Sequence, residues 1–317
     1  MHPKILSIIG IFILLFVTTY SLQAQFSTSS GGRIESEFKL NVPYEIKQDV
    51  WLFLNQEFDQ NGIKNLDTAF NAVVAQEIFY DQYFDNEDLL MYQKKVGVRF
   101  RQRFVMDTLA KELLQLKLPL NDTTGVARQE IKFNVYKKIK KNDRLYMHPF
   151  WKYVRPKNRD EVNLQLASLG ITGDDLSPSV KVRQDRRRIY VSEKGESLLT
   201  MTFDEVCSFY FPYPCYTELE LELNEVRFTN GDQAERERME NINKKVKEKI
   251  MTQFAALQQD QTPKYNKMYL LLKDNMLEKI YSNLMYIIFG IIVAVAIYLF
   301  VANTLAQKQK ILAHADR

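Results

Sequence analysis

Glu35-Ser36-Glu37-Phe38-Lys39 is the stretch that decides the fold of this 317-residue chain. Successive side chains of a β-strand point to opposite faces, so Glu35, Glu37 and Lys39 would share one face and Ser36 and Phe38 the other. Two carboxylates and an ammonium in one row can hold a divalent cation and a phosphate chain side by side. The alternative is an exposed edge strand, whose charges discourage aggregation.

The same alternation recurs along the chain. Basic residues occupy alternate positions in 98–104 and 180–183, glutamates alternate with leucines in 218–223, and shorter versions lie at 114–118 and 127–131. An open sheet has only two edges, so edges do not account for five charged strand faces. A closed barrel accommodates all of them in its interior. We therefore expect an α+β fold, in which a closed, antiparallel, eight-stranded, tunnel-like barrel has a charged interior and helices packed outside.

Seven segments of the chain resemble, in the same order, the motifs of CYTH domains, the triphosphate tunnel metalloenzymes. The segment IESEFK (34–39) resembles their ExExK strand, YFDNEDL (83–89) a conserved turn, and VGVRFR (96–101) an R-x-R strand. LK (116–117) with RQE (128–130), VKVR (180–183), TFDEV (202–206) and ELELE (218–222) follow. The resemblance covers 33–227. The chain departs from the family at 207–216, where a Phe-Pro-Tyr-Pro loop replaces a short Gly-rich turn, and at 136–178, which is longer and more basic.

The resemblance implies hydrolysis of inorganic triphosphate, or of a triphosphate-bearing compound, with Mg²⁺ or Mn²⁺. Arginine and lysine suit phosphate oxygens, and carboxylates supply the hard oxygen ligands that these cations prefer. The expected catalytic residues are Lys39, Arg99 and Arg101. The expected substrate-binding residues are Lys117, Arg128, Lys181, Arg183, Arg186 and Arg103. The expected metal ligands are Glu35, Glu37, Glu220, Glu222, Glu218 and Asp204.

Two other functions fit the same fold. A polyphosphate polymerase would use ATP and would need a cytoplasmic domain. A non-catalytic module would bind polyphosphate or another anion. The net charge of +4 does not indicate nucleic acid as a partner. The basic cluster in 137–144 is expected to be a solvated loop, with an anionic lipid surface or a polyphosphate entry path as alternatives.

Apolar segments at both ends of the chain predict a membrane protein. Residues 1–24 have the features of a signal peptide, or of an uncleaved anchor, and 25–32 of a linker. The CYTH-like domain is expected at 33–230, a helical connector at 231–279, a transmembrane helix at 280–303 and a basic tail at 304–317. The uncharged run 284–302 is long enough to cross the roughly 30 Å hydrocarbon core at about 1.5 Å per residue.

The predicted topology places the domain outside the cytoplasm, in the periplasm or its equivalent. Cys207 and Cys215 flank the Pro-rich loop and could form a disulfide in that compartment. Apolar residues recur at helical spacing from Met239 to Leu257. A helix packed on the outside of the barrel is the expected structure there, and a homodimer formed through this connector is the alternative.

Overall fold

The computed structural model describes residues 33–35, 37–119, 128–135, 148–210 and 213–315. Within these ranges it describes only the backbone of 33–37, 119, 128, 276–282 and 306–315. The predicted signal peptide, the linker and the basic cluster in 137–144 lie outside the described residues. The same is true of the side chains of Glu35, Glu37 and Arg128.

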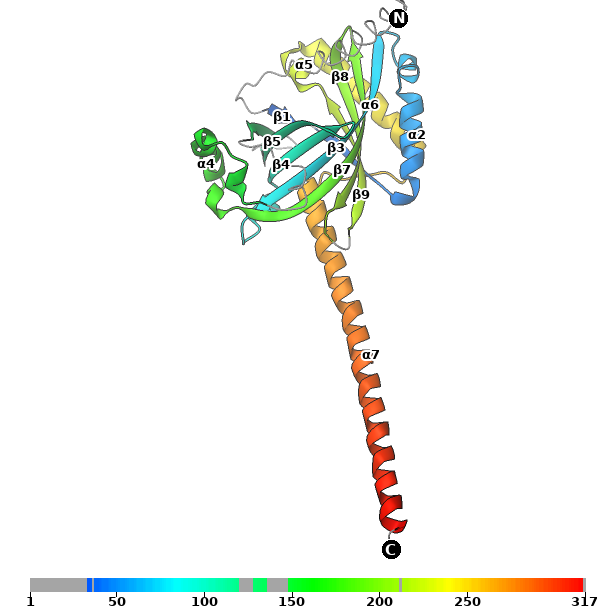
Figure 1. Ribbon diagram of the computed structural model, residues 1–317. Helices are drawn as coiled ribbons and strands as arrows, with labels where there is room; N and C mark the ends of the chain where they lie inside the picture. Colours follow the sequence, from blue (N-terminus) through cyan, green and yellow to red (C-terminus); the bar gives the residue numbers. More distant parts are fainter. Residues whose placement is uncertain (1–32, 36, 120–127, 136–147, 211–212, 316–317) are drawn as a thin grey trace, which may run out of the picture.

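One antiparallel sheet of ten strands dominates the described chain, in the order β1-β6-β5-β4-β3-β7-β8-β9-β2-β10 (Figure 1). The strands are β1 (Arg33–Glu35), β2 (Glu37–Val42), β3 (Phe70–Asp85), β4 (Gly97–Val105), β5 (Thr108–Pro119), β6 (Arg128–Asn134), β7 (Ser177–Glu193), β8 (Glu196–Ser208), β9 (Cys215–Leu223) and β10 (Gln258–Gln259). The α+β class is confirmed. The prediction of a closed, eight-stranded barrel is corrected, because the order is open, with β1 and β10 at its ends.

The two extra strands have separate causes. The first predicted strand is divided into β1, which pairs with β6, and β2, which pairs with β9 near the other end of the order. The segment 258–263, which follows the predicted connector helix, begins with β10, whose Gln258 pairs with Asn41 of β2. Counting β1 and β2 as one interrupted strand and omitting β10 gives the eight predicted strands. The consecutive strands β1 and β2 therefore hydrogen-bond to strands near opposite ends of the sheet.

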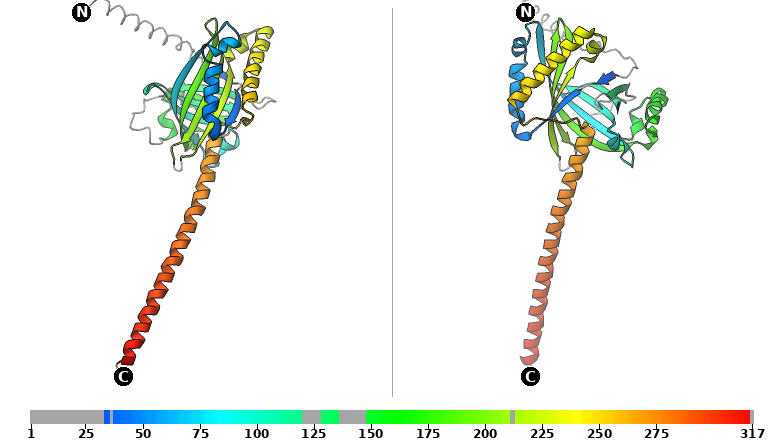
Figure 2. Two further views of the ribbon diagram at one scale, coloured as in Figure 1. Left: turned by 90° about the vertical axis from the view of Figure 1, so that its right-hand side faces the viewer. Right: turned by 180° about the vertical axis from the view of Figure 1, so that it is seen from behind.

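Helices cover the apolar face of the sheet around β9. The alternating sequence of β9 buries Leu219 and Leu221 on this face. Helices α2 (Lys47–Glu57) and α6 (Gln233–Gln253) pack against it (Figure 2), and Phe53 contacts Phe254 at 5.4 Å between ring centroids. The residues that α2 and α6 bury there are Val50, Leu54, Met239, Val246 and Ile250. The prediction of a helix packed outside the sheet is confirmed, and a homodimer through this region stays a prediction.

A second apolar cluster lies under the insertion between β6 and β7. Phe100 of β4 stacks on Tyr153 with 4.0 Å between ring centroids, and Phe84 of β3 contacts both Phe150 and Tyr153. This cluster includes the short helix α3 (Leu90–Gln93) and α4 (Arg159–Ala167). Apart from α7, the remaining described helices are α5 (Glu225–Asn230) and the 3₁₀ helices η1 (Tyr44–Ile46), η2 (Gly62–Asn65), η4 (Phe150–Lys152), η5 (Pro156–Asn158) and η6 (Gly173–Asp175).

Helix α7 (Lys264–Ala315) begins at the sheet and projects from it as one 52-residue element (Figure 1). Among the described helices, it alone has a stretch long and apolar enough to cross a membrane, Asn283–Leu305, and these side chains are exposed. The predicted boundary at 280 therefore falls inside a continuous helix. The first turns of that helix contact the sheet instead of forming a separate connector.

Cys207 and Cys215, whose pairing the sequence analysis left open, form a disulfide between paired positions of β8 and β9. The two cysteines are 8 residues apart, so the bond closes a short loop. Replacing both with alanine should lower the free energy of unfolding by about 2–3 kcal/mol, because the unfolded chain regains the entropy of that loop. Urea denaturation of the variant and the parent measures this difference. A parent whose stability does not respond to a reductant would contradict the expectation.

Candidate functional site

Buried ionisable side chains from neighbouring strands share one face of the sheet, which we call the charged face. Antiparallel register explains their common orientation, because directly paired residues point to the same side. Asp81 pairs with Arg101, Arg186 with Asp204, and Asp204 with Glu218. The charged face is defined by Asp81, Arg99, Arg101, Arg186, Asp204, Glu218 and Glu220, all of them buried.

Asp81 is the centre of the basic half of the charged face. Arg101 donates to both of its oxygens, from Nε at 2.7 Å and from Nη2 at 2.6 Å, and Nη1 of Arg99 donates at 3.2 Å. Gln184 also donates to this carboxylate. Burial acts to raise the pKa of Asp81, but the charges of Arg101 and Arg99 outweigh it and hold the pKa below its usual value.

Amide side chains extend the basic half to β5 and β6. Nε of Arg99 donates to Gln115 at 2.8 Å, and Nε2 of Gln115 donates to Glu130 at 2.8 Å. Lys117 Nζ lies 4.0 Å from Glu130 Oε1. The contacts thus run without a break from β7 through β3, β4 and β5 to β6.

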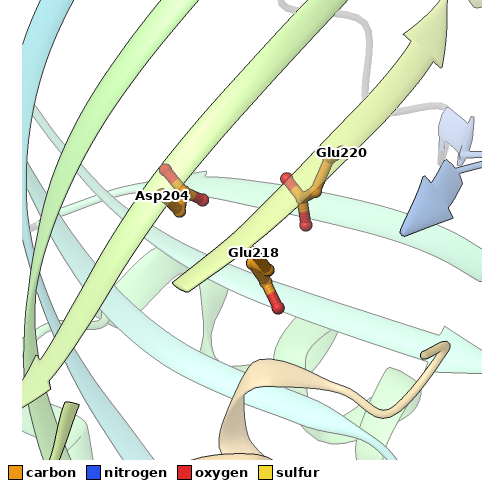
Figure 3. Close-up of side chains that lie close together, drawn as sticks. All are labelled: Asp204, Glu218 and Glu220. Carbon is orange, nitrogen blue, oxygen red and sulfur yellow. The ribbon is translucent and has the colours of Figure 1, made fainter. Parts of the chain in front are cut away.

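Asp204 of β8 and Glu218 and Glu220 of β9 form the acidic half (Figure 3), and one oxygen of each lies within 4.8 Å of the others. Arg186 joins the two halves. Its Nε and Nη2 donate to Asp204 at 2.6 and 2.5 Å, and Nη2 lies 3.7 Å from Glu220. Lys39 Nζ lies 3.0 Å from Glu220. Burial acts to raise the pKa of Asp204, but the charges of Arg186 and Lys264 hold it well below its usual value.

The first turns of α7 bring further groups to the acidic half. Lys264 Nζ lies 2.7 Å from Glu220 and 3.0 Å from Asp204, and it also donates to Glu218. Lys267 donates to the other oxygen of Glu218 at 3.0 Å. The sequence analysis assigned both lysines only to the connector. The available signal was their spacing of three residues just after Pro263, which places both lysines on one face of the first turns of a helix.

The structure brings together seven of the fifteen predicted site residues, including both arginines proposed for catalysis. These are Lys39, Arg99, Arg101, Arg186, Asp204, Glu218 and Glu220. Lys117 adjoins them, and Arg103 pairs with Glu77 of β3. Glu222 lies two residues beyond Glu220 on β9, outside the cluster of three carboxylates.

Lys181 and Arg183 lie on the opposite face of β7, which corrects their predicted place inside the barrel. Strand alternation counted from Arg186 puts both on that face. Lys181 lies over the ring of Phe209, 5.4 Å from its centroid, and burial lowers its pKa to about 8. Arg183 is exposed and pairs with Asp185 at 2.8 Å. On the charged side of β7 the basic positions are Arg186 and Arg188.

The buried carboxylates predict a loss of stability in acid. The pKa values of Asp81 and Asp204 are lowered in the folded protein, so the unfolded chain binds their protons first as the pH falls. Their stabilising contribution is complete above the ordinary aspartate pKa of about 4 and decreases as the pH falls below it. Urea denaturation between about pH 6 and 2.5 should show this decrease. A constant free energy of unfolding over that range would contradict it.

The fold and the site define an α+β protein whose sheet carries opposed acidic and basic groups on one face. The sequence model of the CYTH domain matches residues 36–254, more than half of the chain. The chain therefore belongs to the CYTH domain family. None of the curated proteins matches the sequence significantly.

The solved structures that match this chain include the following three. A putative adenylate cyclase from Bacillus halodurans is 17% identical, with 66% of this chain and 91% of that chain covered and a TM-score of 0.40. A Pyrococcus horikoshii protein is 18% identical, with 76% and 99% covered and a TM-score of 0.41. The RNA triphosphatase Pct1 of S. pombe is 10% identical, with 73% and 90% covered and a TM-score of 0.34.

Proposed function

We propose that the charged face binds a triphosphate, free or as part of a larger compound, and hydrolyses it with a divalent cation. The observation that carries this proposal is the contact between a cluster of arginines and a cluster of three carboxylates. Arg186 links the two, because it binds Asp204, approaches Glu220 and shares the side-chain oxygen of Gln184 with Arg101. A triphosphate needs cations along its length and a metal at one end, and the two halves supply these side by side. Membership of the CYTH family supports the same class of reaction.

The acidic half suits Mg²⁺ or Mn²⁺. Asp204, Glu218 and Glu220 offer hard oxygen donors close enough together to share one cation. When bound, such an ion would neutralise phosphate oxygens and lower the pKa of a coordinated water. Glu35, Glu37 and Glu222 remain proposed additional ligands from β1, β2 and β9.

The arginines of the basic half suit the phosphate chain. Bonds from Arg101 to Asp81 and from Arg186 to Asp204 use Nε and Nη2 in both cases. Each guanidinium also has Nη1, with two further N–H donors, and arginine binds phosphate in a fixed, directional geometry. The carboxylates thus orient the guanidinium planes, and Nη1 can bind substrate oxygens. We assign Lys39, Lys117 and Arg128 to the same task.

We also propose that the sheet, although its strand order is open, curves around the substrate as a tunnel. The pairing of β1 with β6 and of β2 with β9 supports this, since β1 and β2 are consecutive in the chain and pair near opposite ends of the strand order. An enclosed site would exclude water from the polar groups and strengthen their interaction with phosphate.

Phosphate release by the purified full-length protein tests this function. Tripolyphosphate, nucleoside triphosphates and pyrophosphate should be compared with Mg²⁺, with Mn²⁺ and with EDTA. We expect release from at least one triphosphate, dependent on the metal, and little from pyrophosphate. Failure to release phosphate from any triphosphate would contradict the proposal, and synthesis of polyphosphate from ATP would replace it with the polymerase alternative.

We further propose that Asn283–Leu305 anchors the protein in a membrane, with the CYTH domain on the extracytoplasmic side. The disulfide between Cys207 and Cys215 supports that side, because disulfides persist in oxidising compartments. A reporter that is active only outside the cytoplasm should be active when fused after Gly231 and silent when fused after Arg317. The reverse pattern would contradict the orientation and favour the polymerase.

A further inference from the structure

Three side chains hold the first turns of α7 on the sheet, beside the acidic half. Lys264 and Lys267 bind the carboxylates, and Tyr265 donates from its hydroxyl to Asp85 at 2.7 Å while stacking on Tyr83, with 5.4 Å between ring centroids. Lys267 also binds Asp260, 2.9 Å away, in the segment that follows β10. These contacts join the beginning of α7 to β3, β8 and β9.

Lys264 occupies the position that a cation shared by the three carboxylates would need. Its Nζ is within 3.0 Å of an oxygen of Asp204 and of Glu220 and also binds Glu218. A divalent cation would take the same oxygens at about 2.0–2.6 Å. The ammonium and the metal therefore cannot hold these positions together.

Glu218 shows why the cluster needs a cation while its carboxylates are ionised. This residue is fully buried, and α7 engages both of its oxygens, one through Lys264 and the other through Lys267. A buried carboxylate without a partner is strongly unfavourable. If the beginning of α7 left, another cation would have to replace it, or protons would have to neutralise the carboxylates.

We propose that Lys264 is an internal counter-ion that competes with the divalent metal and so controls loading of the site. The proposal rests on the metal site of the proposed function. Binding of the metal requires Lys264 to withdraw, and withdrawal removes contacts that hold the first turns of α7 on the sheet. Between Lys264 and Asn283 the helix is continuous for 19 residues, about 28 Å. The state of the site is therefore coupled mechanically to the position of the apolar segment of α7.

Metal binding without substrate tests the competition in the full-length protein in lipid nanodiscs. Each protein is titrated with Mn²⁺, and electron paramagnetic resonance measures the Mn²⁺ that stays free. This gives the Mn²⁺ affinity of the parent, of Lys264→Gln and of Lys273→Gln. Lys264→Gln keeps hydrogen-bond donors and loses the charge, and should bind Mn²⁺ at least about ten-fold more tightly. Lys273→Gln removes the same charge from an exposed position of the same helix and should match the parent.

Hydrogen exchange of the parent gives a second measurement that depends on no variant. Mn²⁺ should accelerate exchange of the amides in 264–272. Equal Mn²⁺ affinity of Lys264→Gln and the parent, or Mn²⁺ binding that leaves 264–272 equally protected, would overturn the counter-ion and leave the hydrolase proposal standing. Failure of all three proteins to bind Mn²⁺ would overturn the counter-ion and the metal site together.

Discussion

Asp81→Ala should lower the free energy of unfolding by about 3–5 kcal/mol, because it leaves buried guanidinium groups without their counter-charge. Asp81 is fully buried and accepts hydrogen bonds from Arg99, Arg101 and Gln184. The measurement is urea denaturation at pH 7. Asp81→Asn should cost less than Asp81→Ala, since the amide keeps one acceptor oxygen for Arg101.

Asp185→Ala is the matched control for this prediction. Asp185 also lies in the sheet and pairs with an arginine, but Arg183 is exposed. Its removal should cost at most about 1 kcal/mol, as for other ion pairs open to solvent. Equal losses for Asp81→Ala and Asp185→Ala would contradict the assignment of Asp81 as the centre of the basic half.

Glu220→Gln should reduce kcat for the best triphosphate by roughly 10²–10³-fold, the loss expected when one group that stabilises charge in the transition state is removed. The substitution preserves shape but removes a negative charge that the metal requires. Glu220 is also the carboxylate that Lys39 and Arg186 approach, so it joins the acidic half to the basic half. Steady-state phosphate release at saturating Mn²⁺ and substrate measures the effect.

Glu205→Gln provides the matched control for the loss of activity. Glu205 is next to Asp204 on β8, so its side chain points to the opposite face, where it pairs with Lys47 at 2.6 Å. This variant should keep the parental kcat. Thermal unfolding of both variants shows whether they are folded. A folded Glu220→Gln protein with parental kcat would show that this carboxylate does not take part in hydrolysis.

The sequence predicted the sheet best where the charged residues of a strand occupy only every second position, so that all of them share one face. In β9 every second residue from Glu218 is acidic and the residues between are leucine, so only one orientation buries the leucines under α2 and α6. A slip of one residue would reverse both sets. The same alternation predicted a common face for Arg99 and Arg101 of β4, and both arginines contact Asp81 of β3.

The sequence of β7 shows where this reasoning fails. Basic residues occur on both faces of this strand, with Lys181 and Arg183 on one face and Arg186 and Arg188 on the other. Local spacing cannot decide which pair faces the charged side. Pairing with β3 and β8 decides it, because Arg186 is opposite Glu77 and Asp204.

Long-range contacts account for the other residues that the sequence analysis missed. Asp81 is a single carboxylate in an aromatic stretch, and its partners Arg101 and Gln184 are 20 and 103 residues away. Lys264 is 46 residues from Glu218 and lies in the predicted connector, so local sequence did not link it to the acidic half. The pairing of β10 with β2 places the chain just before α7 at the edge of the sheet, from which Lys264 and Lys267 reach the acidic half.

Diffraction at the manganese absorption edge, from crystals grown with Mn²⁺ and tripolyphosphate, tests the central claim most directly. The account predicts an anomalous peak about 2.0–2.6 Å from oxygens of Asp204, Glu218 and Glu220. Phosphate density should adjoin Nη1 of Arg101 and of Arg186, and Lys264 should have withdrawn. Manganese bound elsewhere, with Lys264 still on the three carboxylates and no phosphate at the two arginines, would contradict it.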